Sequence, residues 1–307
     1  MKHFLSIADT PNQDLLHVFE VAFTLRRQRQ QGVANAPILA NKTLAMIFEK
    51  PSLRTRASFE QAAYELGGSA IVMGDAEVGL GRRERPADVA RVLSGMVHGI
   101  MARVFEHAKL LELAQFSSVP VINALSDYTH PCQALADAMT IMDEFGRDLR
   151  GRTLAFIGDG NNVARSLAVL CAKLAMNFVL AAPPGYQLEA PLQRRLKSQV
   201  PGDWLTQTAD PAQAVQAADV IYTDTWVSMG QEADSKKRLK DLAPYQVNEA
   251  LLARAPAHAV VLHCLPAYRG KEITEAMLEG PRCRAFPQAH NRLHAQKGLL
   301  AVLMGGL

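Results

Sequence analysis

The 307-residue sequence has little excess charge of either sign and no long uninterrupted apolar run. Its 33 lysines and arginines, against 30 aspartates and glutamates, leave a formal net charge of +3. Nucleic-acid-binding domains usually carry a strongly basic face, so this balance disfavours that class, and any anionic ligand must be held by a local cluster. The longest apolar region, residues 163–182, is interrupted by Arg165 and Lys173, which indicates a buried helix and strand rather than a membrane span.

Cysteine is scarce, and internal repeats and low-complexity tracts are absent. The four cysteines form no C-x-x-C pair, which disfavours a disulfide framework and the usual structural zinc patterns. The first ten residues lack the apolar run of a secretory signal. A cytoplasmic location with reduced thiols is therefore expected. The cysteines are Cys132, Cys171, Cys264 and Cys283.

What the sequence does contain is a regular alternation of strand and helix patterns. The alternation restarts after a polar, glycine-bounded connection at residues 146–152. Such alternation predicts parallel sheets with right-handed crossovers, so the expected fold class is α/β, with two doubly wound parallel-sheet domains. The expected domains are residues 1–145 and 146–290, with a C-terminal helix at 291–307 packing back on the first. Ligands of such sheets bind at the carboxyl ends of the strands.

The predicted elements are short and closely spaced. Helices are expected at 14–30, 56–66, 86–96, 108–116, 133–145, 163–174, 211–217 and 293–303. Strands are expected at 42–48, 70–73, 99–104, 119–123, 153–157, 178–181, 220–223 and 259–262, with an irregular stretch between 182 and 210.

An anion-binding pattern follows the first predicted strand directly. Residues 49–56 read Glu-Lys-Pro-Ser-Leu-Arg-Thr-Arg and lead into a helix. A helix N-terminus attracts anions through its unbonded amides. Ser52 and Thr55 add hydroxyl donors, and Arg54 and Arg56 add guanidinium groups suited to phosphate or carboxylate. The local chemistry leaves two interpretations open: a phosphate-like ligand, or an ordinary capped helix with solvated arginines.

Three further segments place polar side chains at strand ends. His130 and Gln133 flank a proline at a helix start, where the alternative is a simple cap. Residues 158–163 resemble a dinucleotide fingerprint, but Val163 replaces the third glycine and no acid follows about 20 residues later, so a nicotinamide site is not expected. Asp224 and Cys264 follow two later strands.

Five segments, in order along the chain, resemble the aspartate/ornithine carbamoyltransferase family. They are residues 48–56, Arg103 at its strand end, His-Pro-Cys-Gln at 130–133, Asp-Thr-Trp-Val-Ser-Met-Gly at 224–230 and His-Cys-Leu-Pro at 263–266, with Asn-Arg at 291–292 completing the set. The segment at 224–230 is similar to the ornithine-specific branch. The resemblance implies transfer of the carbamoyl group of carbamoyl phosphate to the δ-amine of L-ornithine, with a carbamoyl-phosphate domain first and an ornithine-binding domain second.

The resemblance also implies residue roles. The implied catalytic residues are Arg103, His130, Asp224 and Cys264. The implied carbamoyl-phosphate ligands are Ser52, Leu53, Arg54, Thr55, Arg103, His130, Gln133, Cys264, Leu265 and Arg292. The implied ornithine ligands are Asn162, Asp224, Ser228 and Met229. No metal and no cofactor are expected, and a homotrimer or a multiple of trimers is implied.

Several positions depart from the commonest family pattern. They are Leu53, Gly79, Arg165, Tyr268 and His290. Gly79 stands where a longer side chain often reaches a neighbouring subunit's phosphate site, and Arg82 or Arg83 is a candidate substitute. Two alternatives therefore stay open: a sister carbamoyltransferase acting on putrescine or an N-acylated ornithine, and a catalytically silent ligand-binding homologue.

Overall fold

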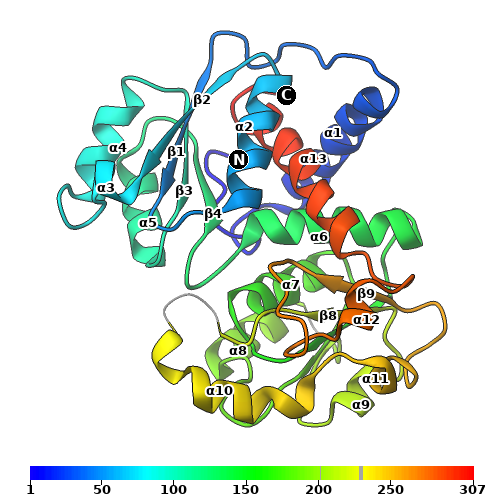
Figure 1. Ribbon diagram of the computed structural model, residues 1–307. Coiled ribbons are helices and arrows are strands. Elements are labelled where there is room, and N and C mark those ends of the chain that lie inside the picture. Colours follow the sequence, from blue (N-terminus) through cyan, green and yellow to red (C-terminus); the bar gives the residue numbers. More distant parts are fainter. Residues whose placement is uncertain (201, 228–230) are drawn as a thin grey trace. The chain divides into compact units, whose positions relative to one another are not determined.

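Parallel strands form two separate sheets in the computed structural model, shown in Figure 1. The structure describes residues 1–200, 202–227 and 231–307. By their internal contacts, residues 1–136 with 290–307 make one unit, and residues 137–289 make the other. Both divisions fall inside continuous helices, α6 (Pro131–Phe145) and α13 (Ala285–Leu303). Among the helices formed by the described residues, none is long and apolar enough to cross a membrane.

The sheet of the first unit has the strand order β2-β1-β3-β4, and every pair is parallel. The chain starts at the inner strand β1, adds β2 on one side, and then adds β3 and β4 on the other. The carboxyl ends of β1 and β3 therefore flank a topological switch point, where ligands of open α/β sheets bind. The strands are β1 (Thr43–Phe48), β2 (Ser69–Gly74), β3 (Gly99–Arg103) and β4 (Val121–Leu125).

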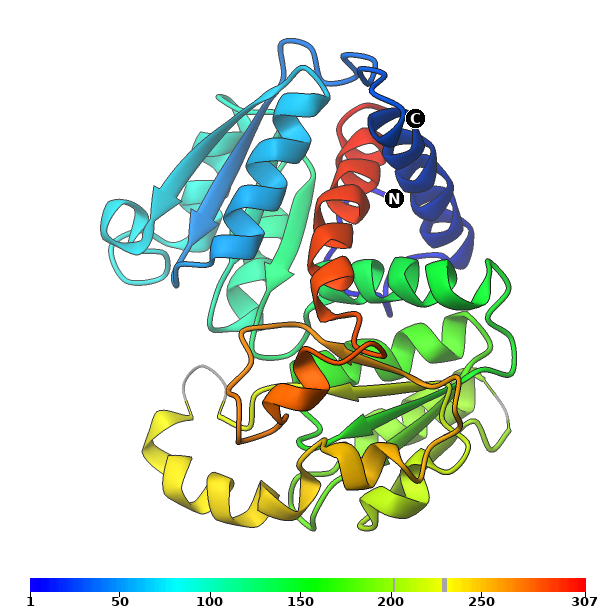
Figure 2. The same ribbon diagram turned by 45° about the vertical axis from the view of Figure 1, so that its right-hand side comes forward.

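Helices cover both faces of this sheet, as Figure 2 shows. Strand β1, in the middle of the sheet, is correspondingly apolar, and five of its six residues are buried. Ala45 and Ile47 of β1 pack in one core with Val89 and Leu110 from the helices. The helices connecting the strands are α2 (Leu53–Glu65), α3 (Asp75–Val78), α4 (Pro86–Ser94) and α5 (His107–Phe116).

Helix α1 (Asn12–Gln30) lies beside α13. Gly298 makes this close approach possible, because a Cβ atom there would lie 2.6 Å from the Ala22 Cβ. Lys297, completely buried, donates from Nζ to Asn35 Oδ1 at 2.7 Å and is paired with Glu65. The C-terminal helix is thus anchored to α2, the helix that carries the anion-binding pattern.

The sheet of the second unit has the order β7-β6-β5-β8-β9 and is also parallel. Here the order reverses between β5 and β8, so this sheet has its own topological switch point. Its strands are β5 (Thr153–Ile157), β6 (Asn177–Ala181), β7 (Leu205–Thr208), β8 (Val220–Thr223) and β9 (Val260–His263). Its helices include α7 (Asn162–Lys173), α8 (Ala190–Gln199), α9 (Pro211–Val215), α10 (Ser235–Leu242), α11 (Glu249–Leu252) and α12 (Glu275–Leu278), with 3-10 turns η1 (Glu232–Asp234) and η2 (Ala243–Tyr245).

The predicted α/β class and two parallel sheets are confirmed. The structure adds α8 and β7 where the sequence predicted an irregular stretch, and two helices begin three or more residues earlier than predicted. Helix α2 begins at Leu53 rather than 56 because Ser52 caps it. Helix α13 begins at Ala285 rather than 293, with Pro287 in its first turn, where the missing N–H removes no helical hydrogen bond.

Candidate active site

The first cluster of predicted site residues is built on the amino end of α2, directly after β1. Ser52 is the N-cap, and its hydroxyl oxygen accepts a hydrogen bond from the Thr55 amide. The cap satisfies one of the amides that helix geometry leaves unbonded, while the other amides and the helix dipole favour an anion. Leu53 is 80% exposed, so only its backbone faces this end of the helix.

Thr55 is completely buried and connects the predicted residues from several elements. Its hydroxyl oxygen accepts from Arg103 Nη1 at 3.5 Å and from Arg292 Nη2 at 3.4 Å. Arg292 also donates from Nη1 to Gln133 Oε1 at 2.8 Å. Arg103 reaches the same place because its strand, β3, pairs with β1 in a register that sets it opposite Phe48.

His130 lies among three arginines and is almost completely buried. Burial lowers the pKa of His130 well below its usual range, and the positive charges of Arg292, Arg103 and Arg54 lower it further. The imidazole is therefore neutral at physiological pH and can donate one N–H without adding a fourth positive charge. Three guanidinium groups so close together repel one another, which favours a ligand carrying negative charge.

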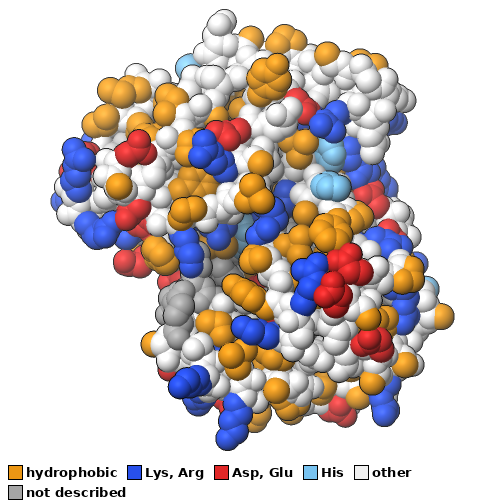
Figure 3. Space-filling view, in the orientation of Figure 1, with side chains coloured by type: hydrophobic (Ala, Val, Ile, Leu, Met, Phe, Trp, Pro, Cys, Tyr) orange, Lys and Arg blue, Asp and Glu red, His pale blue; other side chains and the backbone are white. Residues whose placement is uncertain are grey.

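This concentration of positive charge is local. On the face drawn in Figure 3, basic and acidic side chains are interspersed. Even within the motif, the two arginines have different surroundings: Arg54 acts on His130, whereas Arg56 is exposed and its Nε lies 3.3 Å from Glu60 Oε2, one turn along α2. The structure therefore brings Ser52, Arg54, Thr55, Arg103, His130, Gln133 and Arg292 together and leaves Arg56 on the helix surface.

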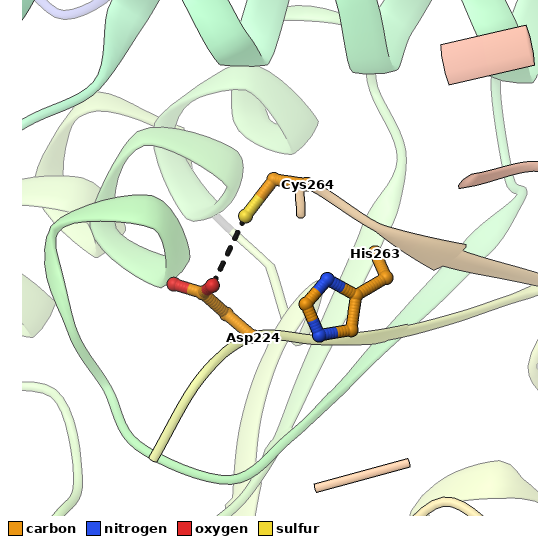
Figure 4. Close-up of side chains that lie close together, drawn as sticks. All are labelled: Asp224, His263 and Cys264. Atoms are coloured by element: carbon orange, nitrogen blue, oxygen red, sulfur yellow. Dashed lines mark hydrogen bonds between the residues drawn. The ribbon is translucent and has the colours of Figure 1, made fainter. Parts of the chain in front are cut away.

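The second cluster surrounds Asp224, the first residue after β8. Its Oδ1 accepts from the Thr225 amide at 2.8 Å and from the Cys264 thiol at 3.0 Å. Its Oδ2 accepts from Asn161 Nδ2 at 2.8 Å. Figure 4 shows the thiol of Cys264 directed at the carboxylate. Because these residues follow β8, β9 and β5, three neighbouring strands, the topology of the sheet places them together.

Asn161 was not among the predicted site residues, but its Nδ2 donates to Asp224; its neighbour Asn162 stays a predicted ornithine ligand. Asn161 caps α7, accepting from the amides of Val163 and Ala164 through Oδ1. That use of Oδ1 leaves Nδ2 to donate to Asp224. The sequence signal that could have identified Asn161 is its position directly after Gly160, where an asparagine often caps the following helix. Asn162 is the first residue of the helix and is half-buried.

Cys264 is held as a thiol. Burial raises its pKa well above the usual range, and the negative charge of Asp224 raises it further. A protonated, buried thiol is a poor nucleophile and a poor metal ligand. The geometry thus favours a hydrogen-bond donor over a covalent catalyst at this position.

The backbone after Cys264 is held by a completely buried histidine. His263 Nδ1 accepts from the Leu265 amide at 2.9 Å, and its Nε2 lies 3.1 Å from Glu272 Oε1. Leu265 has a positive φ of 58°, a conformation uncommon outside glycine, and precedes a cis bond to Pro266. Backbone in this region persists when its surroundings impose it, and it occurs often at ligand sites.

The donor atoms of Asp224, His263 and Cys264 lie within 4.8 Å of one another, a spacing that suits a metal ion. Both nitrogens of His263 already have hydrogen-bonding partners, and the thiol donates to the carboxylate. A metal would have to displace these bonds and deprotonate the thiol. The arrangement is better suited to hydrogen bonding.

The loop that contains Gly79 is closed on itself. A Cβ atom at Gly79 would lie 2.7 Å from the Arg83 Cβ, and the backbone there has a positive φ of 59°, so a larger residue requires this loop to change. Arg82 pairs with Asp75, and Arg83 donates to the Glu77 carbonyl at 3.3 Å.

Ser228 and Met229, two of the predicted ornithine ligands, lie outside the described residues.

The fold and the two strand-end clusters define a two-sheet α/β protein with an arginine-rich site in one unit and a carboxylate–thiol site in the other. Residues 2–143 match the family profile described as aspartate/ornithine carbamoyltransferase, carbamoyl-P binding domain, and residues 150–303 match its Asp/Orn binding domain. The chain belongs to the aspartate/ornithine carbamoyltransferase family.

Individual relatives agree over the whole chain. Ornithine carbamoyltransferases of Methanopyrus kandleri and Archaeoglobus fulgidus are each 48% identical over 305 residues, covering 99% of this chain and 97% and 98% of their own. The solved structure of ornithine carbamoyltransferase from Pyrococcus furiosus has a TM-score of 0.94 at 43% identity, covering 100% of this chain and 98% of that one. The enzyme from Thermus thermophilus has a TM-score of 0.89 at 40% identity, with 99% of both chains covered.

Proposed function

We propose that this chain transfers the carbamoyl group of carbamoyl phosphate to the δ-amine of L-ornithine, giving L-citrulline and phosphate. The observation that carries this proposal is the convergence of Arg54, Arg103 and Arg292 on a neutral His130, within the segment that matches the carbamoyl-P binding domain. The similar proteins at 45–48% identity over nearly the whole chain are named for ornithine, which favours this amine over putrescine or an N-acylated ornithine.

The first unit has the chemistry to bind the dianion and to activate the carbonyl. The amino end of α2, with Ser52, Leu53 N–H, Arg54 and Thr55, holds the phosphate. Arg103, His130 and Thr55 donate to the carbonyl oxygen as it gains negative charge, and preorganised donors of this kind stabilise the transition state. Gln133 and Arg292 position the carbamoyl group, while Leu265, another residue implied for carbamoyl phosphate, belongs to the second unit.

The second unit has the chemistry to bind and orient a cationic amino acid. Asp224 attracts the amino groups of ornithine, and Asn162, Ser228 and the Met229 backbone hold the remainder. The neutral δ-amine attacks the carbamoyl carbon, the new C–N bond forms, and the C–O bond to phosphate breaks. The amine proton leaves with the phosphate group. Cys264 contributes a hydrogen bond and no covalent intermediate, since its thiol remains protonated.

The domain boundaries, the assembly and the location belong to the same proposal. Residues 1–145 with 291–307 bind carbamoyl phosphate and residues 146–290 bind ornithine. The change of profile between residues 143 and 150 supports the boundary, and the contacts that group residues 290–307 with the first unit support the place of the C-terminal helix. The protein acts in the cytoplasm, in arginine metabolism, as a homotrimer or a multiple of trimers. A sedimentation measurement giving a mass near a multiple of three times 33.5 kDa would support the assembly.

A ureido assay with carbamoyl phosphate and a panel of ornithine, putrescine, N-acetylornithine and N-succinylornithine tests the reaction. We expect ornithine to be the one amine of the panel that gives product. If none of the four amines gives product, the chain is a catalytically silent homologue. Arg103→Ala and His130→Ala should each reduce citrulline formation by about 100-fold or more, because each removes a donor to the developing oxyanion. Near-normal turnover in either purified variant would contradict the role given to that residue.

A further inference from the structure

Glu49 lies between the end of β1 and the anion-binding pattern, just ahead of the helix cap Ser52. Its amide donates to the Arg103 carbonyl at 3.0 Å, directly beyond the last ladder pair of β1 and β3, which joins Phe48 and Arg103. Figure 1 shows these two strands side by side. The chain that leads into the anion site is therefore bonded to the chain that carries Arg103.

The carboxylate of Glu49 makes two more hydrogen bonds, and both join it to the chain that follows Arg103. Its Oε2 accepts from the Phe105 amide at 2.6 Å, and its Oε1 accepts from Lys109 Nζ, in the first turn of α5, at 2.7 Å. The side chain of Glu49 is 4% exposed and that of Lys109 is 16% exposed. Because both oxygens already have donors from the protein, this carboxylate holds backbone in place and is not a ligand-binding group.

The strand that carries Arg103 is irregular at this point. The register of β3 against β4 shifts between Ala102 and Arg103, and such bulges bend a strand and redirect its side chains. In a regular parallel pair, a residue bonds to the neighbouring strand through both its amide and its carbonyl. Glu49 makes the first bond with its amide, but its carboxylate, in place of its carbonyl, accepts from Phe105. The carboxylate thus fixes the bent chain after Arg103 while the backbone of Glu49 turns away from the sheet.

The same chain is bonded onward to the loop that carries His130. The Phe105 carbonyl accepts from the Asp127 amide at 2.9 Å, and Asp127 Oδ1 accepts from the His107 amide at 2.9 Å. All of these residues belong to the first unit. A displacement of the chain at Phe105 would therefore disturb both Arg103 and the loop before His130.

We propose that Glu49 is a positioning residue that fixes the chain after Arg103 and thereby sets the affinity of the first unit for carbamoyl phosphate. Lys109 holds the carboxylate of Glu49 in the orientation that accepts from Phe105. The inference rests on the proposed function, in which Arg103 donates to the carbonyl oxygen of carbamoyl phosphate. Without this support, the guanidinium group must be ordered when the substrate binds, and ordering a group on binding costs affinity.

The first test compares Glu49→Met, which removes the acceptor, with Glu49→Gln, which keeps an oxygen for the Phe105 amide. Isothermal titration with carbamoyl phosphate measures the Kd. Glu49→Met should raise this Kd about tenfold, the effect of one lost hydrogen bond to a charged group. Glu49→Gln should stay within about threefold of the unchanged protein, because the bond to Phe105 can still form. Equal weakening by the two variants would overturn the proposal.

Glu112→Met is the matched control, since Glu112 lies in the same unit and has the same kinds of partner. Its Oε1 accepts from the Ala87 amide at 3.3 Å and lies 3.6 Å from Arg85 Nη2. Glu112→Met should leave the Kd for carbamoyl phosphate within about twofold of the unchanged protein, because neither of its partners leads to a predicted site residue. A Glu49→Met variant that binds as tightly as Glu112→Met would overturn the proposal.

A double-mutant cycle asks whether Lys109 acts through Glu49. Lys109→Met alone should raise the Kd for carbamoyl phosphate about fivefold, and in a Glu49→Met background it should change the Kd by less than about twofold, because the group it holds has gone. A full fivefold change in that background would show that Lys109 acts on the ligand by its charge, and would overturn its role in the proposal.

Steady-state kinetics separate positioning from a general loss of structure. Glu49→Met should lower kcat/KM for carbamoyl phosphate about tenfold or more, and at saturating carbamoyl phosphate it should leave the KM for ornithine within about twofold. Equal losses for both substrates would indicate a merely structural role and overturn the proposal. If Glu49→Met does not fold, Lys109→Met decides, with Arg85→Met as its control, and equal Kd values for carbamoyl phosphate in those two variants would overturn the proposal.

Arg54→Ala separates the inference from the function on which it rests. If Arg54→Ala leaves the Kd for carbamoyl phosphate unchanged, the assigned anion site fails and the inference fails with it. If Arg54→Ala weakens carbamoyl phosphate binding and Glu49→Met does not, only the positioning role is overturned.

Discussion

At the scale of single residues, position in the helix decides which side chains of the anion motif can act. Arg54 and Arg56 are two residues apart, so they project from α2 in different directions. Arg54 acts electrostatically on His130, while Arg56 lies on the surface with Glu60. Two arginines of the same motif thus have different environments in the fold.

This difference gives a paired prediction. Arg54→Ala should lower kcat/KM for carbamoyl phosphate by about 100-fold, because a charge-assisted contact to the ligand is lost at a partly buried site. Arg56→Ala should stay within about threefold of the unchanged protein, since exposed ion pairs contribute little. Steady-state kinetics at saturating ornithine measure both. Equal losses in the two variants would contradict the assignment of Arg54 alone.

A second residue-scale prediction concerns stability and pH. Burial, followed by the charges of Lys297, Arg26 and Arg29, lowers the pKa of His294 to about 4. The unfolded chain, with a histidine pKa near 6.5, therefore binds a proton between about pH 6.5 and 4 that the folded chain does not. The free energy of unfolding should fall as the pH decreases through this window, by about 2 kcal/mol from this group.

Urea unfolding at pH 7 and pH 4.5 tests that prediction. His294→Gln should lose less stability on acidification than the unchanged protein. His17→Gln provides the control, because His17 is exposed and should leave the pH dependence unchanged. A His294→Gln variant with an unchanged pH dependence would rule out the linkage.

Some of the site could be predicted from single residues and some could not. The sequence was enough to predict the positions of Ser52, Thr55 and Asp224, because a helix cap or a strand end determines where such side chains point. The contact of Asn161 with Asp224 could not be predicted, because two adjacent asparagines offer the same chemistry. Only the geometry of the helix cap shows which side-chain amide reaches Asp224. The neutral state of His130 also depends on arginines far away in sequence.

At the scale of elements, the long apolar strands were predictable and the short polar elements were not. Strand β7 has one buried residue in four, and α8 contains three basic residues, so neither has a clear period. Strand β7 pairs with β6 at the edge of the sheet, and α8 lies in the crossover connection that the two parallel strands require. The start of α13 was predicted too late because of Pro287. A proline beyond the first turn ends or kinks a helix, whereas Pro287 lies within the first turn and is tolerated there.

The anchoring of α13 to α2 gives an element-scale prediction. Lys297 is completely enclosed, whereas Glu65 keeps 15% of its side chain exposed. Removing either partner of a buried ion pair costs about 3–5 kcal/mol, mostly from the charge left behind. Glu65→Gln leaves the more deeply buried charge, that of Lys297, without its carboxylate partner. It should therefore destabilise the protein more than Lys297→Met.

Chemical unfolding of the two variants at pH 7 measures this difference. Arg29→Met is the matched control, because Arg29 also contacts Glu65 but is 49% exposed. It should cost less than about 1 kcal/mol. The prediction fails if Lys297→Met is the least stable of the three.

At the scale of the whole molecule, each sheet has its own switch point, and each carries its own cluster of predicted site residues. The alternation of strands and helices was enough to predict both sheets, because parallel strands need crossover connections. The strand order was not predictable from the pattern alone. It depends on which strands pair, and pairing is decided by packing of the whole chain.

The division of chemistry between the units predicts separable binding. Isothermal titration should show that Asp224→Asn leaves the Kd for carbamoyl phosphate within about twofold of the unchanged protein, while Arg54→Ala weakens it by at least about tenfold. In kinetic assays Asp224→Asn should raise the KM for ornithine. Loss of carbamoyl-phosphate binding in Asp224→Asn would contradict the assignment of one substrate to each unit.

The raised thiol pKa values have a consequence for chemical durability. Burial raises the pKa of Cys132 to about 12, and burial also raises those of Cys171 and Cys264. Peroxide and electrophiles attack the thiolate, which for Cys132 is present at neutral pH in fewer than about one in ten thousand molecules. Burial and the negative charge of Asp224 therefore also protect the Cys264 sulfur from oxidation.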